Sequence, residues 1–230
     1  MSKIKVIIPA YNEEDSIAKV ISEIPNIVEE IIVVNNNSTD NTGVYAEKAG
    51  ATVLNESRKG YGYACLKGME YLSKSEIEPD IVVFLDGDYS DYPGELTKLV
   101  APIIDNNIDF VVGARVKRFR EVKAMTPQQQ FGNWLATTLM KLMFDARFTD
   151  LGPFRAIKYQ KLMDLEMEDK TYGWTVEMQL KSIRHNLTYM EVPVRYRQRI
   201  GVSKVSGTVK GVIFAGFKIL GWIFKYSLRK

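Results

Sequence analysis

Short apolar runs alternate with helix-like patterns through the first 113 residues of the chain. The runs have the length and the β-branched content of buried strands, and the stretches between them carry apolar residues at helical spacing. Such an alternation is typical of an α/β fold, a mostly parallel sheet with helices on both faces. We expect strands at residues 4–10, 29–35, 51–54, 82–86 and 108–113, and helices at 13–24, 40–49, 62–73 and 94–106.

Polar segments follow three of these strands, at the edge where such sheets bind ligands. They are residues 9–13, 35–40 and 86–88. In the last of them, Asp86 and Asp88 flank Gly87, which lets a bulky ligand approach the backbone. Two carboxylates in this arrangement suit Mg²⁺ or Mn²⁺ held jointly with a substrate diphosphate. A solvated turn is the alternative, because the same residue types are common in turns.

Composition narrows the class of protein. The single cysteine excludes an intramolecular disulfide framework, and the single histidine excludes a His/Cys zinc cluster. The first residues are too polar for a signal peptide, so we expect a cytoplasmic protein.

Residues 192–230 carry nine Lys or Arg and no Asp or Glu. This basic end favours an anionic partner, either a membrane surface or a phosphate-bearing substrate, and we expect no nucleic-acid partner.

Four motifs follow one another along the chain: PAYNEE at 9–14, a VDDGSTD-like turn at 34–40, the glycine-containing stretch 60–68, and the D-x-D pair at 86–88. Together they resemble the motifs of the family 2 glycosyltransferases, which have a Rossmann-like GT-A fold. The resemblance continues through 113–115, 149–155 and 191–204, and is strongest to the polyprenyl-phosphate (dolichyl-phosphate-type) sugar transferases. It implies an inverting, metal-dependent transfer of a hexose from a nucleotide sugar to a polyprenyl phosphate.

The resemblance also implies roles for individual residues. The residues expected to bind the nucleotide sugar are Pro9, Ala10, Tyr11, Glu13, Asn35, Asn36, Lys59, Gly60, Gly62, Asp86, Gly87 and Arg115. Metal binding, of Mg²⁺ or Mn²⁺, falls to Asp86 and Asp88, and the catalytic residues are Asp88, Asp150 and Arg155. The residues expected to bind the acceptor and its phosphate are Arg155, Arg199, Ser203 and Lys204. Gly60 and Gly62 are expected to let the backbone lie against phosphate or sugar.

Asn35 and Asn36 depart from the family pattern, which has Asp at both positions to accept from the base or the ribose. Asn offers a donor as well as an acceptor, so we favour a UDP-sugar as donor and keep GDP-mannose open. The same departure supports an alternative class, a membrane-associated binding protein whose nucleotide site has decayed.

The need for a general base depends on the acceptor. A lipid monophosphate, with a second pKa of about 6, is largely ionised at neutral pH and attacks unaided. A soluble or glycan hydroxyl, the alternative acceptor, needs a base such as Asp150, Asp91 or Glu177. No candidate stands out among them, which favours the phosphate as the acceptor.

Two other charged features have alternative interpretations. Arg155 can instead form a salt bridge with Asp150. The basic stretch 116–130 fits a mobile loop and a solvated linker equally well.

The stretch 208–226 has the pattern of an amphipathic helix. Lys210, Lys218 and Lys225 fall on one side, and apolar residues cover most of the rest. The apolar runs are too short to span a bilayer, so we expect a helix in the membrane interface, with the lysines toward the headgroups and Trp222 at the boundary. A core-packing or oligomer-forming helix is the alternative.

These patterns together predict a domain organisation. The GT-A domain covers residues 1–206, with a nucleotide-sugar part at 1–115 and an acceptor part at 116–206, and the membrane-surface helix covers 207–230. We expect a peripheral protein on the inner face of the membrane. A membrane partner or a homo-oligomer is left open.

Overall fold

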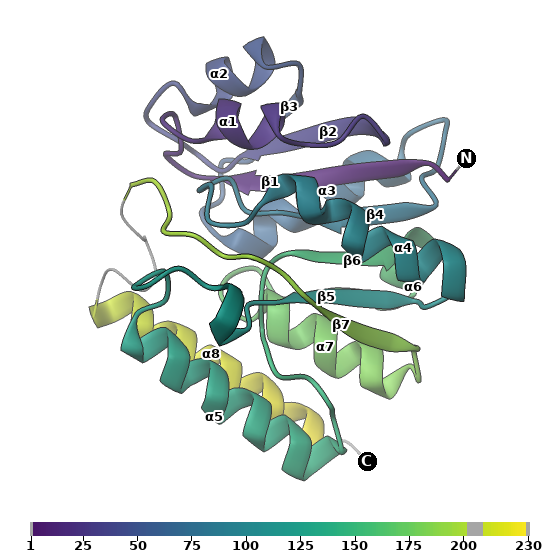
Figure 1. Cartoon of the computed structure of the whole chain (residues 1–230), viewed down its shortest axis with the longest axis vertical. Coiled ribbons are helices and arrows are strands. Elements are labelled where there is room, and N and C mark those ends of the chain that lie inside the picture. The colour runs from purple at the N-terminus through teal and green to yellow at the C-terminus, as the bar shows by residue number, and fades with distance from the viewer. Residues whose placement is uncertain (1, 202–208, 229–230) are drawn as a thin grey trace.

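The computed structural model describes residues 2–201 and 209–228 of the 230-residue chain. Within them lies one seven-stranded sheet with the strand order β3-β2-β1-β4-β6-β5-β7 (Figure 1). The strands are β1 Ile4–Ala10, β2 Val28–Asn35, β3 Thr52–Asn55, β4 Ile81–Phe84, β5 Phe110–Ala114, β6 Arg155–Lys158 and β7 Tyr189–Pro193. The helices are α1 Ile17–Ser22, α2 Thr42–Lys48, α3 Tyr61–Ser73, α4 Leu96–Asn106, α5 Pro127–Phe144, α6 Tyr159–Asp164, α7 Trp174–Arg184 and α8 Val209–Leu228, with short 3₁₀ turns at Pro93–Glu95 and Lys117–Phe119.

The strands β1 to β4 form the parallel half of the sheet. β1 lies between β2 and β4, and β3 pairs with the outer side of β2, all in parallel. β1 and β4 are buried along their whole length, which explains their continuous apolar sequences. The predicted elements of this half are confirmed, with boundaries shifted by a few residues. The carboxyl ends of its strands meet at one edge of the sheet.

The strand β6 was not predicted. It pairs antiparallel with both β4 and β5, and β5 pairs in parallel with β7. Its four residues, RAIK, include only two apolar ones between two charged ones, so its sequence pattern could not be distinguished from that of a loop, whereas the equally short β4 is apolar throughout. The sheet is therefore mixed but mostly parallel, and residues on both sides of position 115 contribute to it.

Helices cover both faces of the sheet, as the α/β pattern predicts (Figure 1). On one face, α1, α2 and α4 pack against side chains that include Val6 and Ile8 of β1. On the other face, α3, α6 and α7 surround a core that includes Ile7, Phe84 and Trp174. Successive residues of β1 thus serve opposite faces, which fixes this strand at the centre of the domain.

The helices α5 and α8 lie side by side outside the second face (Figure 1). α8 turns described lysines toward the protein, because Lys218 pairs with Asp169 and Lys225 pairs with Glu168, each at 3.3 Å. Trp222 is buried between them. The predicted orientation, with lysines toward headgroups and Trp222 at the membrane boundary, is therefore wrong. The side chain of Lys210 lies outside the described part of the chain.

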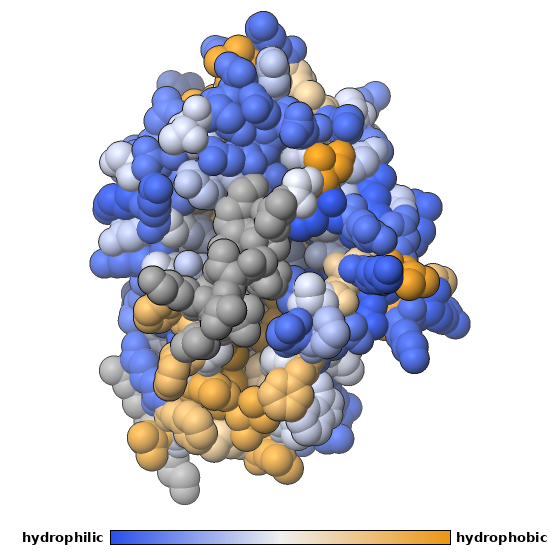
Figure 2. All heavy atoms as spheres, turned by 90° about the vertical axis from the view of Figure 1, so that its left-hand side faces the viewer, coloured by the Kyte–Doolittle hydropathy of each residue, from blue (hydrophilic) through white to orange (hydrophobic). Residues whose placement is uncertain are grey.

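Apolar side chains instead form the outer surface of these two helices. They are Phe131, Trp134, Leu142 and Met143 of α5 and Phe214, Phe217, Phe224 and Leu228 of α8, and we call them the α5–α8 apolar face. Figure 2 shows hydrophobic side chains gathered at this end of the molecule. Neither helix contains Asp or Glu. Among the described residues, no helix has the length and hydropathy needed to cross a membrane.

Candidate active site

The three polar segments expected at the sheet edge do meet there. The backbone N–H of Asn36, after β2, donates to the carbonyl of Ala10 at the end of β1 (2.8 Å). The hydroxyl of Ser16 donates to the carbonyl of Gly87, after β4 (2.8 Å). These bonds tie the ends of the three central parallel strands into one rigid floor for a ligand.

The residues predicted to bind the nucleotide divide into core and surface. Pro9 and Ala10 are buried, whereas Tyr11 is half-buried and Lys59 is exposed. The Lys59 ammonium lies 5.3 Å from the centroid of the Tyr11 ring. An aromatic ring and a cation side by side suit a base and a phosphate, and the role of these two residues in nucleotide binding stays a prediction.

Asn36 joins two loops. Its Nδ2 donates to the carbonyls of Arg58 (2.7 Å) and Glu56 (3.3 Å), and its Oδ1 accepts from the N–H of Gly60 (2.8 Å). A carboxylate has no donor for the two carbonyls, which gives a physical reason for Asn at this position. Asn35 also uses both Oδ1 and Nδ2 within the protein. Both amides are thus engaged in the structure itself.

The D-x-D turn carries one carboxylate with both oxygens engaged and one with an oxygen that lacks a donor. Asp88 Oδ1 accepts from the N–H (2.9 Å) and the hydroxyl (2.6 Å) of Ser90, and its Oδ2 lies 3.0 Å from an Arg199 nitrogen. Asp86 Oδ1 is buried and meets no donor among the described residues. Side chains stand 3.4–3.5 Å from where a Cβ of Gly87 would lie, so this glycine faces packed protein. The expectation that it lets a bulky ligand approach the backbone is therefore wrong.

Burial raises the pKa values of two carboxyl groups in this region. Burial, followed by repulsion from Asp88, raises the pKa of Asp86 to about 7. Asp91 is 1% exposed, and neither of its carboxyl oxygens finds a donor in the described chain. Burial and then repulsion from Asp86 raise the pKa of Asp91 well above its ordinary value. Both carboxyl groups are therefore harder to ionise than an exposed Asp.

These carboxylates fit a divalent cation that a diphosphate helps to hold. Within the described ranges, 2–201 and 209–228, no three His, Cys, Asp or Glu side chains are arranged to hold a metal ion by themselves. Mg²⁺ is commonly held by one or two carboxylates together with substrate phosphates and water. Asp86 and Asp88 would supply the protein ligands.

Gly60 and Gly62 pack against a distant part of the chain. A Cβ on Gly62 would lie 2.0 Å from the carbonyl oxygen of Asp169, and a Cβ on Gly60 would lie 2.2 Å from that of Lys170. Two N–H groups at the start of α3 also donate to carbonyls within residues 168–173. The expectation that these glycines lie against phosphate or sugar does not hold here, because segment 168–173 occupies that position.

Arg115 and Asp150 form a buried, bidentate ion pair. Asp150 Oδ1 accepts from Nη2 (2.6 Å), and its Oδ2 accepts from Nε (2.8 Å) and from the backbone N–H (2.7 Å) of Arg115. Burial opposes ionisation of Asp150, but the Arg115 guanidinium outweighs it and holds the pKa below its usual value. Asp150 is therefore a poor base, and the alternative salt bridge with Arg155 is wrong because Arg115 is its partner.

Arg155 belongs to the core. It is fully buried on β6, and its guanidinium donates to the carbonyls of Thr175 (3.0 Å), Leu151 (3.4 Å) and Gly152. Burial lowers its pKa to about 10. The predicted contact between Arg155 and the acceptor phosphate is therefore corrected: this side chain stabilises the turn that carries Asp150.

Glu177 is also fully buried, on α7. Its carboxylate accepts two backbone N–H bonds from Glu168 and Asp169 (2.7 Å each) and pairs with Lys181 (3.0 Å). A carboxylate that is fully buried and held by three donors of the protein itself is not accessible to a substrate. The prediction that Glu177 faces the cleft as a base is therefore wrong.

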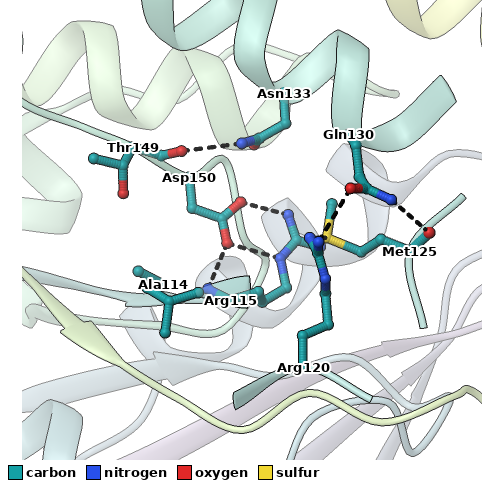
Figure 3. Close-up of a pocket in the computed structure, with 9 residues that line it drawn as sticks. Ala114, Arg115, Arg120, Met125, Gln130, Asn133, Thr149 and Asp150 are labelled. Carbon is teal, nitrogen blue, oxygen red and sulfur yellow. Dashed lines mark hydrogen bonds and ion pairs between the residues drawn. The ribbon is translucent and has the colours of Figure 1, made fainter. Parts of the chain in front are cut away.

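A polar pocket of about 210 Å³ opens beside the first turns of α5 (Figure 3). Arg120, from the basic stretch 116–130, reaches toward α5 and donates to Gln130 Oε1 (3.1 Å). Asn133 Nδ2 donates to the carbonyl of Thr149 (3.0 Å). The lining residues are Ala114, Arg115, Val116, Arg120, Met125, Gln130, Asn133, Thr149 and Asp150.

Of the other predicted acceptor residues, Arg199 contacts Asp88 and also Glu13, at 2.9 Å. Ser203 and Lys204 lie outside the described residues.

The comparisons with known proteins agree with this geometry. The sequence profile described as glycosyl transferase family 2 matches residues 5–165. The chain belongs to this family. The enzyme is a glycosyltransferase, and it is 33% identical over 220 residues to an uncharacterized glycosyltransferase of Mycobacterium tuberculosis, covering 92% of this chain and 94% of the relative. It is also 28% identical over 222 residues to the undecaprenyl-phosphate mannosyltransferase of Micrococcus luteus, covering 91% and 90%.

A solved structure supports the fold of this glycosyltransferase. Glucosyl-3-phosphoglycerate synthase of Mycobacterium tuberculosis, in complex with Mn²⁺, UDP and glucosyl-3-phosphoglycerate, matches with a TM-score of 0.77 at 20% identity. The match covers 98% of this chain and 80% of that chain. The predicted GT-A fold is thereby confirmed.

Some structurally important residues were not predicted. Buried Asp169 accepts from the indole N–H of Trp222 (2.6 Å) and from two backbone N–H groups of its own turn. The sequence Asp-Lys-Thr-Tyr-Gly, which begins at Asp169, is a recognisable turn signal. Gln130, Asn133 and Thr149 of the pocket are isolated polar residues, and no spacing marks them in the sequence.

Proposed function

We propose that this glycosyltransferase transfers a hexose from a nucleotide sugar to a polyprenyl phosphate at the cytoplasmic face of a membrane, with inversion at the anomeric carbon. A UDP-sugar is the favoured donor, GDP-mannose is the alternative, and Mg²⁺ or Mn²⁺ is the cofactor. The observation that carries the proposal is the position of the α5–α8 apolar face directly beside the polar pocket. A lipid phosphate needs both kinds of surface within one molecule's length.

The start of α5 contributes to both surfaces. Gln130 and Asn133 line the pocket, while their neighbours Phe131 and Trp134 are exposed on the apolar face. Arg120 adds a guanidinium, whose planar donors suit a phosphate. We therefore assign the pocket to the acceptor phosphate and the adjoining face to the isoprenoid chain and surrounding lipid.

The charge around the apolar face favours an anionic lipid surface. Lys141 and Arg147 are exposed near its edge, and the absence of Asp and Glu from α5 and α8 leaves no like charge to repel phosphate headgroups. Helices that present aromatic and aliphatic side chains outward can lie in a bilayer interface without crossing it.

The carboxylates of the site fit an acceptor that is already ionised. Asp150 is held by Arg115, Glu177 is buried in α7, and Asp91 is 1% exposed. None of the three is placed to take a proton from a sugar hydroxyl, whereas a phosphate monoester needs no base. Asp86 and Asp88 would hold the divalent cation, which when bound stabilises the negative charge on the leaving diphosphate.

The test is transfer of labelled sugar into an organic phase. Purified protein receives Mn²⁺ or Mg²⁺, undecaprenyl phosphate and labelled UDP-sugars or GDP-mannose, with Asp88→Asn in parallel. Metal-dependent label in the lipid, reduced at least 100-fold in the variant, is the expected result. Label transferred only to soluble phosphorylated acceptors would refute the lipid acceptor, and the lack of any transfer or nucleotide binding would favour a decayed site.

Vesicle flotation tests the membrane part separately. Phe214 and Phe217 are replaced together by Ser, and Ile104→Ser, which removes an exposed apolar residue of α4, is the matched control. We expect wild type and control to float with phosphatidylglycerol vesicles and the double variant to lose at least tenfold in partitioning, because each buried CH₂ contributes about 0.8 kcal/mol. Equal flotation of all three proteins would contradict the assigned face.

A further inference from the structure

The segment that follows β7 runs back toward the ends of the parallel strands (Figure 1), where it is hydrogen-bonded to the D-x-D turn. The backbone N–H of Arg197 donates to the carbonyl of Ser90 (2.9 Å), and that of Ile200 donates to the carbonyl of Asp88 (3.0 Å). The Arg197 side chain is anchored beside the turn by Glu23 (3.0 Å). These bonds hold residue 199, between the two anchors, above the carboxylate of Asp88.

Arg199 uses this position to neutralise the site. One guanidinium nitrogen lies 3.0 Å from Asp88 Oδ2 and another lies 2.9 Å from Glu13 Oε1. Because Ser90 already donates twice to Asp88 Oδ1, both oxygens of Asp88 are engaged by the chain itself. Oδ2, the oxygen that Arg199 holds, is the one without another donor and hence the one best placed for a cation.

The guanidinium also has a donor to spare. Arg199 Nε is buried and meets no acceptor among residues 2–201 and 209–228. A diphosphate oxygen at this place would satisfy that N–H and provide the arginine with a new anionic partner. Charge balance points the same way: two positive charges competing for one carboxylate repel each other unless an added anion separates them.

We infer that Arg199 is a built-in counter-ion of Asp88 that competes with the divalent cation and is displaced only when the nucleotide diphosphate arrives. The inference rests on the proposed function, in which cation and nucleotide share this site, and adds an order of binding to it. The free enzyme binds the metal weakly, the nucleotide and the metal bind cooperatively, and Arg199 passes from Asp88 to the diphosphate. Metal is thereby kept out of an empty site.

The test measures Mn²⁺ binding directly, by the electron paramagnetic resonance signal of free Mn²⁺, with and without UDP. The proteins are wild type, Arg199→Gln, Arg199→Lys and Arg195→Gln, a control that removes the same charge from an exposed arginine that pairs with Glu95. We expect Arg199→Gln to bind Mn²⁺ alone at least tenfold more tightly than wild type and to lose most of the enhancement by UDP. Arg199→Lys and Arg195→Gln should stay within threefold of wild type.

Equal Mn²⁺ affinity of wild type and Arg199→Gln in the absence of UDP would overturn the competition. If metal-dependent sugar transfer persists in that case, the proposed function stands and only the role of Arg199 is refuted. Failure of every protein to bind Mn²⁺, with or without UDP, would overturn the inference and also remove the cation from the proposed function. Thermal unfolding of each variant verifies that the fold is intact.

Discussion

Replacing Gly62 by Ala should destabilise the protein, although alanine is the better helix former. A Cβ at this position would stand 2.0 Å from the carbonyl oxygen of Asp169 and 2.7 Å from its carbon, so the backbone of segment 168–173 has to move by about 1 Å. The neighbour is main chain, which cannot rotate out of the way as a side chain does.

The size of the effect follows from what that movement breaks. Two backbone hydrogen bonds join α3 to segment 168–173, from Gly62 to Thr171 (3.3 Å) and from Tyr63 to Lys170 (3.1 Å), and each contributes about 1 kcal/mol. Overpacking adds roughly 1–3 kcal/mol, while the higher helix propensity of Ala returns at most about 1 kcal/mol. We expect a net loss of about 2–4 kcal/mol in the free energy of unfolding.

Urea unfolding followed by tryptophan fluorescence measures this loss. Gly221→Ala on α8 is the matched control, because nothing lies within 4 Å of its new Cβ. It should leave stability unchanged or raise it by up to about 1 kcal/mol. A Gly62→Ala protein within about 0.5 kcal/mol of wild type would refute the close approach of the two segments.

Three further changes probe buried or paired groups by the same unfolding measurement. Asp150→Asn leaves the Arg115 guanidinium buried beside a neutral amide and should cost about 3 kcal/mol; a cost below about 1 kcal/mol would mean that the pair is not buried as described. Trp222→Phe leaves a buried carboxylate one donor short and should cost about 1–2 kcal/mol, and no cost would argue against the packing of α8. Hydrogen bonds from Arg58 lower the pKa of Glu56 to about 2 from 4.5, so Glu56→Gln should lower stability by about 1 kcal/mol above pH 5. That difference should shrink as the pH falls from 4.5 toward 2, because protonation removes the same contribution from wild type; a difference independent of pH would contradict the ion pair.

The sequence predicted the parallel half of the fold well, because β1, β2 and β4 are long or continuously apolar and their periods are unambiguous. It also brought the polar strand ends together correctly, since parallel strands present their carboxyl ends at one edge. β6 was missed because its sequence, RAIK, has only two apolar residues between two charged ones, unlike the wholly apolar β4. Its neighbours are what make it a strand.

The candidate site was predicted in part, for a different physical reason. Asp86 and Asp88 follow a strand directly, so their position comes from the strand alone. The partners of Arg155, Asp150 and Glu177 come from distant segments, and the same charged residue can face a cleft or a buried carbonyl without any change in its sequence neighbourhood. The side of α8 that faces the protein was misjudged likewise, because Asp169 and Glu168, which attract its lysines, lie far away in the chain.

The place of β6 in the sheet has a consequence for synthesis of the protein. β4 is made early, yet one of its two neighbours in the sheet is β6, which is made later and also pairs with β5. Until residue 158 has left the ribosome, both strands keep an unpaired edge that can associate with other chains. We therefore expect a nascent chain that ends near residue 115 to need protection from aggregation, and folding to become cooperative only when β6 is available.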